Sequence, residues 1–199
     1  DAVGSDDYIT TVNLKMVSGM FVFNDGTNKG WISFRWGNPE ADVHWGIEKC
    51  YDYYYNTFSR NSWDNNGLQI PSFVHVNVQK DGNKLDYSRY FNAACFGPTV
   101  INGNLVGFMM YGDGGFIPGG HYWNPVTALD VTGHEFTHGI TRQTAGLLYQ
   151  NESGALNEGF SDIFAAIIEY DNKPNSTNNW LIGEEFIINL DGNPYMRNM

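Results

Sequence analysis

The chain has 199 residues, of which 42% are apolar and 17% charged, and its formal net charge at pH 7 is −11. This charge argues against nucleic acid and against an anionic membrane as partners, because both would repel an acidic surface. The apolar fraction suffices for a folded core, and no apolar stretch approaches the ~20 residues that span a bilayer.

Strands are expected in the N-terminal part of the chain. Residues 8–36 alternate short β-prone runs with Gly, Asn and Asp turns. From Asp42 the apolar residues recur at helical spacing, which predicts an amphipathic helix that ends near Arg60. From Phe73 valines alternate with polar residues, so a further strand is expected. Asn102-Gly103 separates two β-prone runs and predicts a two-residue hairpin turn.

Helices are expected in the C-terminal part. Residues 126–144 contain no proline, although Gly133 and Gly139 weaken this helix. A second helix is expected from about Ala155 to Tyr170. The predicted fold class is α+β. Its β-rich part, residues 1–124, has one long helix near 42–60 and is followed by a helical part, residues 125–199.

Cys50 and Cys95 are too few for a disulfide scaffold. They could pair in an oxidising compartment, or they could be two buried thiols, and the sequence leaves both alternatives open. The chain begins at Asp1 without an initiator Met, as a processed enzyme or a shortened piece would.

The residues 134–138 form an H-E-x-x-H motif within the first of the two C-terminal helices. Because His134 and His138 are four positions apart, their imidazoles lie one turn apart on the same face and can reach one metal ion. Glu135 can point toward a water bound to that metal. The structural alternative is a pair of core histidines that bind no metal.

Two acidic residues of the next helix favour the metal site. A catalytic zinc needs a third protein ligand and an open fourth position. Glu158, placed at the start of that helix, is close enough in sequence for an antiparallel helix pair to bring it to the same ion. Asp162 is one turn further on the same face and can accept a hydrogen bond from a ligand histidine. A solvated helix face would not explain this joint spacing.

The segment from Gly133 to Tyr170, GHEFTHGITRQTAGLLYQNESGALNEGFSDIFAAIIEY, resembles the thermolysin family of zinc metalloendopeptidases nearly residue for residue. Weaker matches lie at residues 41–67, 92–94, 109–114 and 196–199, so the resemblance covers about residues 40–199. It implies a thermolysin-like fold and a secreted protease, made as a zymogen, that hydrolyses internal peptide bonds.

The resemblance also implies roles for individual residues. The ligands of one catalytic zinc would be His134, His138 and Glu158. Glu135 would act as general base, and Asp162 would orient His134. Tyr149 matches a tyrosine that helps to stabilise the tetrahedral intermediate.

Further matches imply a substrate-binding cleft. Asn92 and Ala93 would hold the substrate backbone by strand addition, and Arg197 would bind the carbonyl beyond the cut. An apolar pocket for the residue after the scissile bond would be lined by Phe116, Val131, Ile182 and Met196. The chain is longer than the family pattern between Asn92 and Tyr111 and between Phe116 and Asp130, and both insertions border this cleft.

The resemblance extends to calcium. Asp130, Glu169 and Glu184 match calcium-binding carboxylates of the family, whereas Asn179 and Leu181 replace two others. In some members a leucine at the latter position offers only its backbone carbonyl. Fewer charges favour one structural calcium rather than a double site. The alternative is a set of plain surface acids.

Two alternatives to an endopeptidase are considered. An aminopeptidase with the same zinc core would need an acidic recognition motif such as G-x-M-E-N, which the sequence lacks. A catalytically incomplete fragment or non-catalytic zinc-binding module is the other alternative. The family continues into a C-terminal helical domain that supplies a further histidine. We therefore expect residues 1–199 to lack that domain. The expected partners are the peptide substrate and either that C-terminal domain or a second chain.

Overall fold

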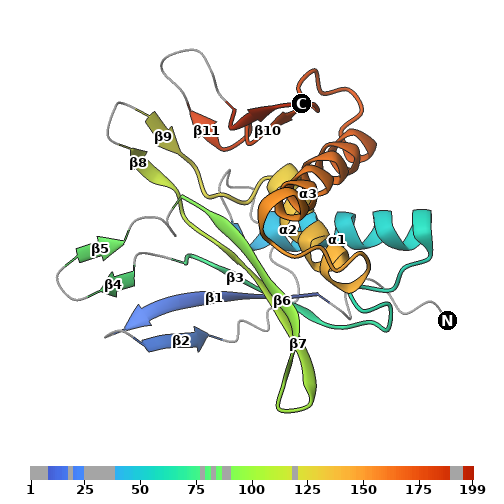
Figure 1. The fold of residues 1–199 in the computed structure, drawn as a ribbon. Helices are drawn as coiled ribbons and strands as arrows, with labels where there is room; N and C mark the ends of the chain where they lie inside the picture. Colours follow the sequence, from blue (N-terminus) through green and yellow to red (C-terminus); the bar gives the residue numbers. More distant parts are fainter. Residues whose placement is uncertain are drawn as a thin grey trace.

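The computed structural model describes residues 9–17, 20–24, 39–76, 79–81, 84–86, 91–117, 121–188 and 195–199. Residues 25–36 of the predicted β-prone stretch, and Val78 of the strand predicted from Phe73, lie outside this part. Figure 1 shows the helices gathered beside a twisted sheet, with β6 (Ala93–Ile101) and β7 (Asn104–Tyr111) passing the helix α2 (Leu129–Gln143). The H-E-x-x-H motif lies on α2, which packs against β6, α1 (Pro39–Phe58) and α3 (Asn151–Asn172).

Five strands form the main sheet, in the order β2-β1-β3-β7-β6. Their bounds are Ile9–Val17 for β1, Met20–Asn24 for β2, Ile70–Val74 for β3, Ala93–Ile101 for β6 and Asn104–Tyr111 for β7. β3 is parallel to both of its neighbours, whereas β2 and β6 pair antiparallel with theirs. Among the described strands, β6 is therefore the terminal strand of this sheet, and one of its edges has no partner there.

The predicted hairpin turn is confirmed at Asn102-Gly103, between β6 and β7. The backbone φ angles are 50° at Asn102 and 80° at Gly103. Positive φ at both central residues is the requirement of a type I′ turn, which asparagine and glycine tolerate best. The strand predicted from Phe73 begins three residues earlier, at Ile70, and ends at Val74.

The helix α1, Pro39–Phe58, begins three residues before the predicted start and ends two residues before the predicted end. Pro39 suits a first helical position, because its missing N–H would have no partner there. Ser59, with a φ of 53°, ends the helix. The buried side of α1 joins the hydrophobic core through Val43, Ile47, Cys50, Tyr51 and Tyr54.

The two C-terminal helices are α2, Leu129–Gln143, and α3, Asn151–Asn172. α3 begins about one turn before the predicted start at Ala155. Its first turn is polar, so the apolar periodicity did not include it, while Glu152 there interacts favourably with the helix dipole. Glu158 consequently lies about two turns inside α3, not at its start.

Three small sheets complete the described structure. Their strands are β4 (Gln79–Asp81), β5 (Lys84–Asp86), β8 (Gly115–Ile117), β9 (His121–Trp123), β10 (Leu181–Ile182), β11 (Ile187–Ile188) and β12 (Arg197–Asn198). β4 pairs with β5, β9 lies between β8 and β11, and β10 pairs with β12. The last pair brings Arg197 beside Ile182. No helix among these residues is both long and apolar enough to cross a membrane.

Candidate active site

Two glycines allow α2 to pack closely against its neighbours. A Cβ at Gly139 would lie 2.2 Å from the ring of Trp63, and one at Gly133 would lie 3.1 Å from the Ala165 backbone on α3. Trp63 is fully buried and donates its indole N–H to the carbonyl of Phe136 over 2.9 Å. The glycines that weaken the helix in the sequence are therefore positions where the tertiary packing excludes a side chain.

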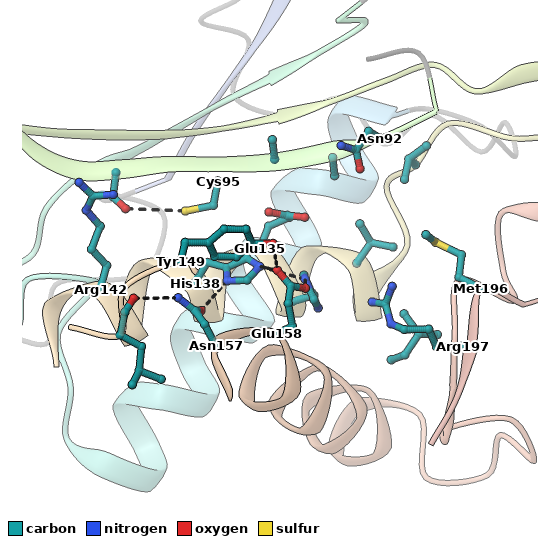
Figure 2. A pocket seen from close by; sticks show the side chains of 18 of the residues that line it. Asn92, Cys95, Glu135, His138, Arg142, Tyr149, Asn157, Glu158, Met196 and Arg197 are labelled. Atoms are coloured by element: carbon teal, nitrogen blue, oxygen red, sulfur yellow. Dashed lines mark hydrogen bonds and ion pairs between the residues drawn. The ribbon is translucent and has the colours of Figure 1, made fainter. Parts of the chain in front are cut away.

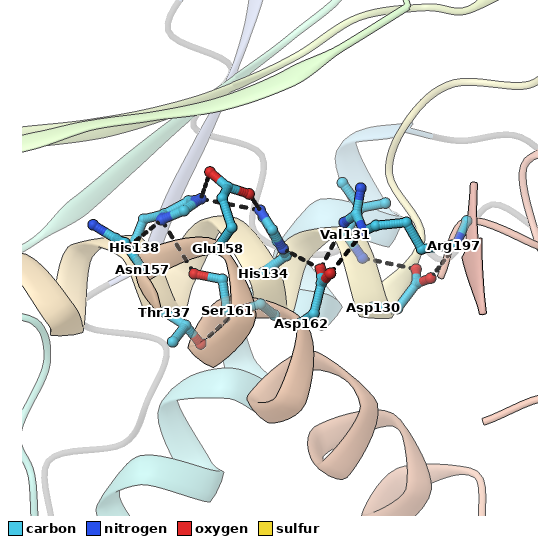
Figure 3. A network of polar contacts seen from close by, with 12 residues as sticks. Asp130, Val131, His134, Thr137, His138, Asn157, Glu158, Ser161, Asp162 and Arg197 are labelled. Atoms are coloured by element: carbon cyan, nitrogen blue, oxygen red, sulfur yellow. Dashed lines mark hydrogen bonds and ion pairs between the residues drawn. The ribbon is translucent and has the colours of Figure 1, made fainter. Parts of the chain in front are cut away.

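The three predicted zinc ligands lie together in the structure (Figure 3). α2 contributes His134 and His138, and α3 contributes Glu158. The two Nε2 atoms are 3.0 Å apart. Glu158 places one carboxylate oxygen 3.2 Å from His134 Nε2 and the other 3.5 Å from His138 Nε2. Ligands at ~2.1 Å around a tetrahedral zinc are about 3.4 Å apart, so this triangle fits a zinc ion.

The far nitrogen of each histidine is held by a side chain of α3. Asp162 lies 2.7 Å from His134 Nδ1, as the sequence predicts. Asn157 Oδ1 lies 2.8 Å from His138 Nδ1, with the Ser161 hydroxyl 3.1 Å from the same atom. Asn157 and Ser161 were not among the residues expected from the sequence, although their positions beside Glu158 on α3 are a signal that could have revealed them.

These contacts set the protonation of both rings. A carboxylate and an amide oxygen accept hydrogen bonds, so each Nδ1 carries a proton and each Nε2 is left to face the other histidine and Glu158. The two Nε2 atoms, 3.0 Å apart, thus converge with the Glu158 carboxylate on one point, where a cation would be held by all three groups. The chemistry of the donor set thus fits a metal ion.

Glu135 is buried, with 8% of its surface exposed, and it lines the same cavity as the three ligands. Burial raises its pKa to about 7, against the opposing effects of nearby His134 and of a hydrogen bond from the Cys95 backbone amide. This carboxylate is not one of the three groups around the metal position. It is placed beside that position, where a general base must lie.

Tyr149 is exposed and lies beside the metal position. Its hydroxyl donates a hydrogen bond to Glu158 Oε1, and its ring lies edge-on to that of His138, with 6.0 Å between the centroids. A donor at this place can reach a substrate oxygen that binds beside the metal.

A cavity of about 660 Å³ surrounds these groups (Figure 2). It is lined by six of the predicted substrate residues, Asn92, Ala93, Val131, Ile182, Met196 and Arg197. The side chain of the seventh, Phe116 on β8, lies outside the described part of the structure. Arg197 donates to Asp162 through Nε at 2.7 Å and Nη2 at 2.6 Å, which connects this arginine to the residue that holds His134.

Cys50 and Cys95 are both free thiols and form no disulfide with each other in the structure. Cys50 is buried and Cys95 is partly buried. Burial raises the pKa of both thiols well above the ordinary value. Cys50 belongs to the core, whereas Cys95, on β6, lines the cavity.

A second acidic cluster joins Asp130, Glu169 and Glu184, with one oxygen of each within 4.8 Å of the others. Calcium holds oxygens at 2.3–2.6 Å, so two ligands can be up to about 5.2 Å apart and the cluster fits one ion. Burial, followed by repulsion from Asp130, raises the pKa of Glu169 to about 8 and that of Glu184 to about 7. Glu169 Oε2 and Glu184 Oε2 are buried, and no described residue gives either oxygen a hydrogen bond.

Two residues that replace calcium-binding carboxylates of the family, Asn179 and Leu181, are close in sequence to Glu184 of this cluster. Asn179 is buried and its Oδ1 has no hydrogen-bond partner, while its amide donates to the carbonyl of Lys173. Leu181 belongs to β10 and comes three residues before Glu184 in the sequence. Lys173 places its ammonium 3.3 Å from Glu169 Oε1 and 2.5 Å from Glu185 Oε1. This ammonium neutralises part of the negative charge of the carboxylates around it. Less negative charge therefore remains to bind a second calcium ion.

Comparisons with known proteins show which family the chain resembles. Residues 5–142 match the family described as "Thermolysin metallopeptidase, catalytic domain", and residues 145–199 match "Thermolysin metallopeptidase, alpha-helical domain". The second match assigns residues 145–199 to the helical domain, so the expectation that this domain is missing from the chain is not confirmed.

Individual relatives are similar over most of the chain. A neutral protease (NprE) of Bacillus pumilus is 41% identical over 149 residues, which is 74% of this chain and 40% of that protein. A bacillolysin of Bacillus subtilis (strain 168) is 41% identical over the same length and is covered to 23%. The solved precursor of protealysin, a metalloproteinase from Serratia proteamaculans, has a TM-score of 0.65 at 28% identity, over 96% of this chain and 52% of that one. The chain thus spans between about a quarter and half of the length of these proteins.

Proposed function

The chain belongs to the thermolysin metallopeptidase family, and from that premise we propose that it forms the zinc-binding part of a secreted endopeptidase that hydrolyses internal peptide bonds. The observation that carries the proposal is the geometry of His134, His138 and Glu158, whose nitrogen and oxygen atoms lie at tetrahedral ligand separations. The secreted location rests on the resemblance to this family.

The residues of the chain have distinct tasks in this proposal. Zinc, when bound, supplies a Lewis acid and lowers the pKa of a bound water toward ~7. Glu135 accepts the proton of the attacking water on one carboxylate oxygen, and then delivers it to the leaving amine. Tyr149 donates its O–H to the oxygen that becomes negatively charged in the tetrahedral intermediate.

Substrate binding is proposed along the edge of β6. Asn92 and Ala93 lie at this unpaired edge, where an extended peptide can add as a further strand. Val131 and Ile182 are buried and Met196 is exposed at one end of the cavity. These side chains favour an apolar residue after the scissile bond. Arg197, held by Asp162, would donate to a substrate carbonyl there.

A peptide assay with three possible outcomes tests the function. The protein purified from its natural source is incubated with a peptide blocked at both ends and, in parallel, with one that has a free N-terminus. We expect cleavage of an internal bond in both peptides, loss of activity with a zinc chelator, and recovery when zinc is returned. Cleavage of the second peptide alone would show an aminopeptidase, and zinc binding without cleavage of either peptide would show a non-catalytic module.

One structural calcium is proposed at Asp130, Glu169 and Glu184, supported by the two unpartnered buried oxygens of this cluster. Because a ligand bound only to the folded state stabilises it, removing calcium should lower the melting temperature. The measurement is a thermal melt with and without a calcium-selective chelator. The matched control is Glu169→Gln, in which the chelator should have a smaller effect. An unchanged melting temperature in the parent protein would show that this site holds no calcium.

A further inference from the structure

The two ends of the active-site cavity differ in chemical character (Figure 2). At one end lie Val131, Ile182 and Met196, the apolar residues of the proposed pocket. At the other end lies Arg142, whose side chain rises from α2 toward β6. The zinc ligands lie between the two ends, so a bound peptide would meet apolar side chains on one side of the scissile bond and a positive charge on the other.

Positions along α2 determine this order. Val131, His134, His138 and Arg142 are three, four and four residues apart, so they share one face of the helix. At 1.5 Å per residue, Val131 lies about 7.5 Å before the midpoint of the two histidines and Arg142 about 9 Å after it. Residues of an extended strand advance by about 3.3 Å each, so both positions are within two or three substrate residues of the metal position.

β6 runs above α2 in the same sense. Asn92 precedes this strand at the apolar end of the cavity, and Cys95 lies toward the end with Arg142. A peptide that pairs antiparallel with β6 therefore has its C-terminal part at the apolar end and its N-terminal part at Arg142. This direction agrees with the apolar preference proposed after the scissile bond.

Alternation along a strand selects one substrate residue. Successive side chains of an extended peptide point to opposite sides, so side chains two residues apart face the same way. If the residue after the scissile bond points toward Val131 on α2, then the second residue before the bond points toward α2 as well. That second residue is on the side of Arg142.

The charge of Arg142 is available to a substrate. Arg142 is exposed, and within the described ranges no hydrogen bond or ion pair joins its side chain to a carboxylate. The other arginine that lines the cavity, Arg197, is already paired with Asp162. The carboxylates that line the cavity, Glu135 and Glu158, have their own roles at the metal position.

We propose that Arg142 selects substrates with an acidic side chain at the second position before the scissile bond. This inference rests on the proposed endopeptidase function and specifies its substrates further. An exposed ion pair is weak, so the preference for Glu over Gln at this position should be about two- to fivefold in kcat/KM. It should decrease at high salt, because exposed charges are screened.

Two blocked peptides that differ only by Glu or Gln at this position, with Ala before the bond and Leu after it, test the proposal. The parent protein should cleave the Glu peptide faster by the factor above, and Arg142→Gln should bring the ratio of the two kcat/KM values to about one. Arg142→Glu should favour a third peptide with Lys at the position. Lys49→Gln, which removes a positive charge on α1 paired with Glu48, should leave the ratio unchanged.

The outcomes separate the two proposals. Equal cleavage of the Glu and Gln peptides by the parent protein, or a preference that Arg142→Gln does not alter, would overturn the role of Arg142 and leave the endopeptidase function standing. A preference for Glu found only after the scissile bond would also overturn it, because the peptide would then run the other way. Cleavage of neither peptide would overturn the endopeptidase function and the role of Arg142 with it.

Discussion

Replacing Glu135 by Gln should abolish most of the peptidase activity while the protein keeps its zinc. Gln has nearly the same shape but cannot accept the proton of the attacking water, and general-base catalysis contributes about 10²–10⁴-fold to the rate. The same group also transfers the proton to the leaving amine, so the loss should lie toward the upper end of this range. Metal binding should persist, because Glu135 is not among the groups around the metal position.

The measurement is kcat/KM on a blocked peptide, together with the zinc content of the purified protein. Glu152→Gln is the matched control, since Glu152 is an exposed glutamate in the first turn of α3. The control should have the activity of the parent protein. Near-normal turnover of Glu135→Gln with bound zinc would remove Glu135 from the role of general base.

Glu158→Ala should lower the affinity for zinc more than any substitution outside the three ligands. The change leaves two imidazoles to hold the ion and removes the only negatively charged ligand. Asp162→Ala should have a smaller effect, a factor of about 10–100, because Asp162 orients His134 and does not contact the metal. Asn157→Ala, at the corresponding place beside His138, should resemble Asp162→Ala.

Competition with a chromogenic zinc chelator measures these affinities. Glu152→Ala, which removes an exposed carboxylate from the same helix, is the control and should bind zinc like the parent protein. Equal retention of zinc by the parent protein and by Glu158→Ala would contradict the three-ligand site. A larger loss of zinc affinity in Asp162→Ala than in Glu158→Ala would show that Asp162, not Glu158, is the carboxylate ligand.

The sequence was sufficient to predict that four side chains of the candidate site lie together. His134 and His138 are four residues apart, and helical geometry alone places them on one face. Glu158 and Asp162 have the same spacing on the next helix, so a single packing of two helices brings all four together. The Asn102-Gly103 turn was predictable for a similar reason, because the required backbone angles favour these two residues.

Features that depend on tertiary contacts could not be predicted in this way. Gly133 and Gly139 weaken a helix considered alone, whereas in the structure they make room for Ala165 and Trp63. Asn157 holds His138 only because α3 lies against α2 in one rotation, which the sequence pattern did not determine. The polar first turn of α3 has no apolar periodicity, so the predicted helix was one turn too short.

The central claim is that two imidazoles and one carboxylate of this chain bind a zinc ion, and X-ray absorption at the zinc edge tests it most directly. Protein purified with its metal should show nitrogen and oxygen ligands at about 2.0–2.2 Å, including the pattern of two imidazole rings. Cys95 lines the same cavity but lies outside the three-residue cluster, so no sulfur ligand is expected. A sulfur shell at about 2.3 Å, or the absence of imidazole ligands, would contradict the account.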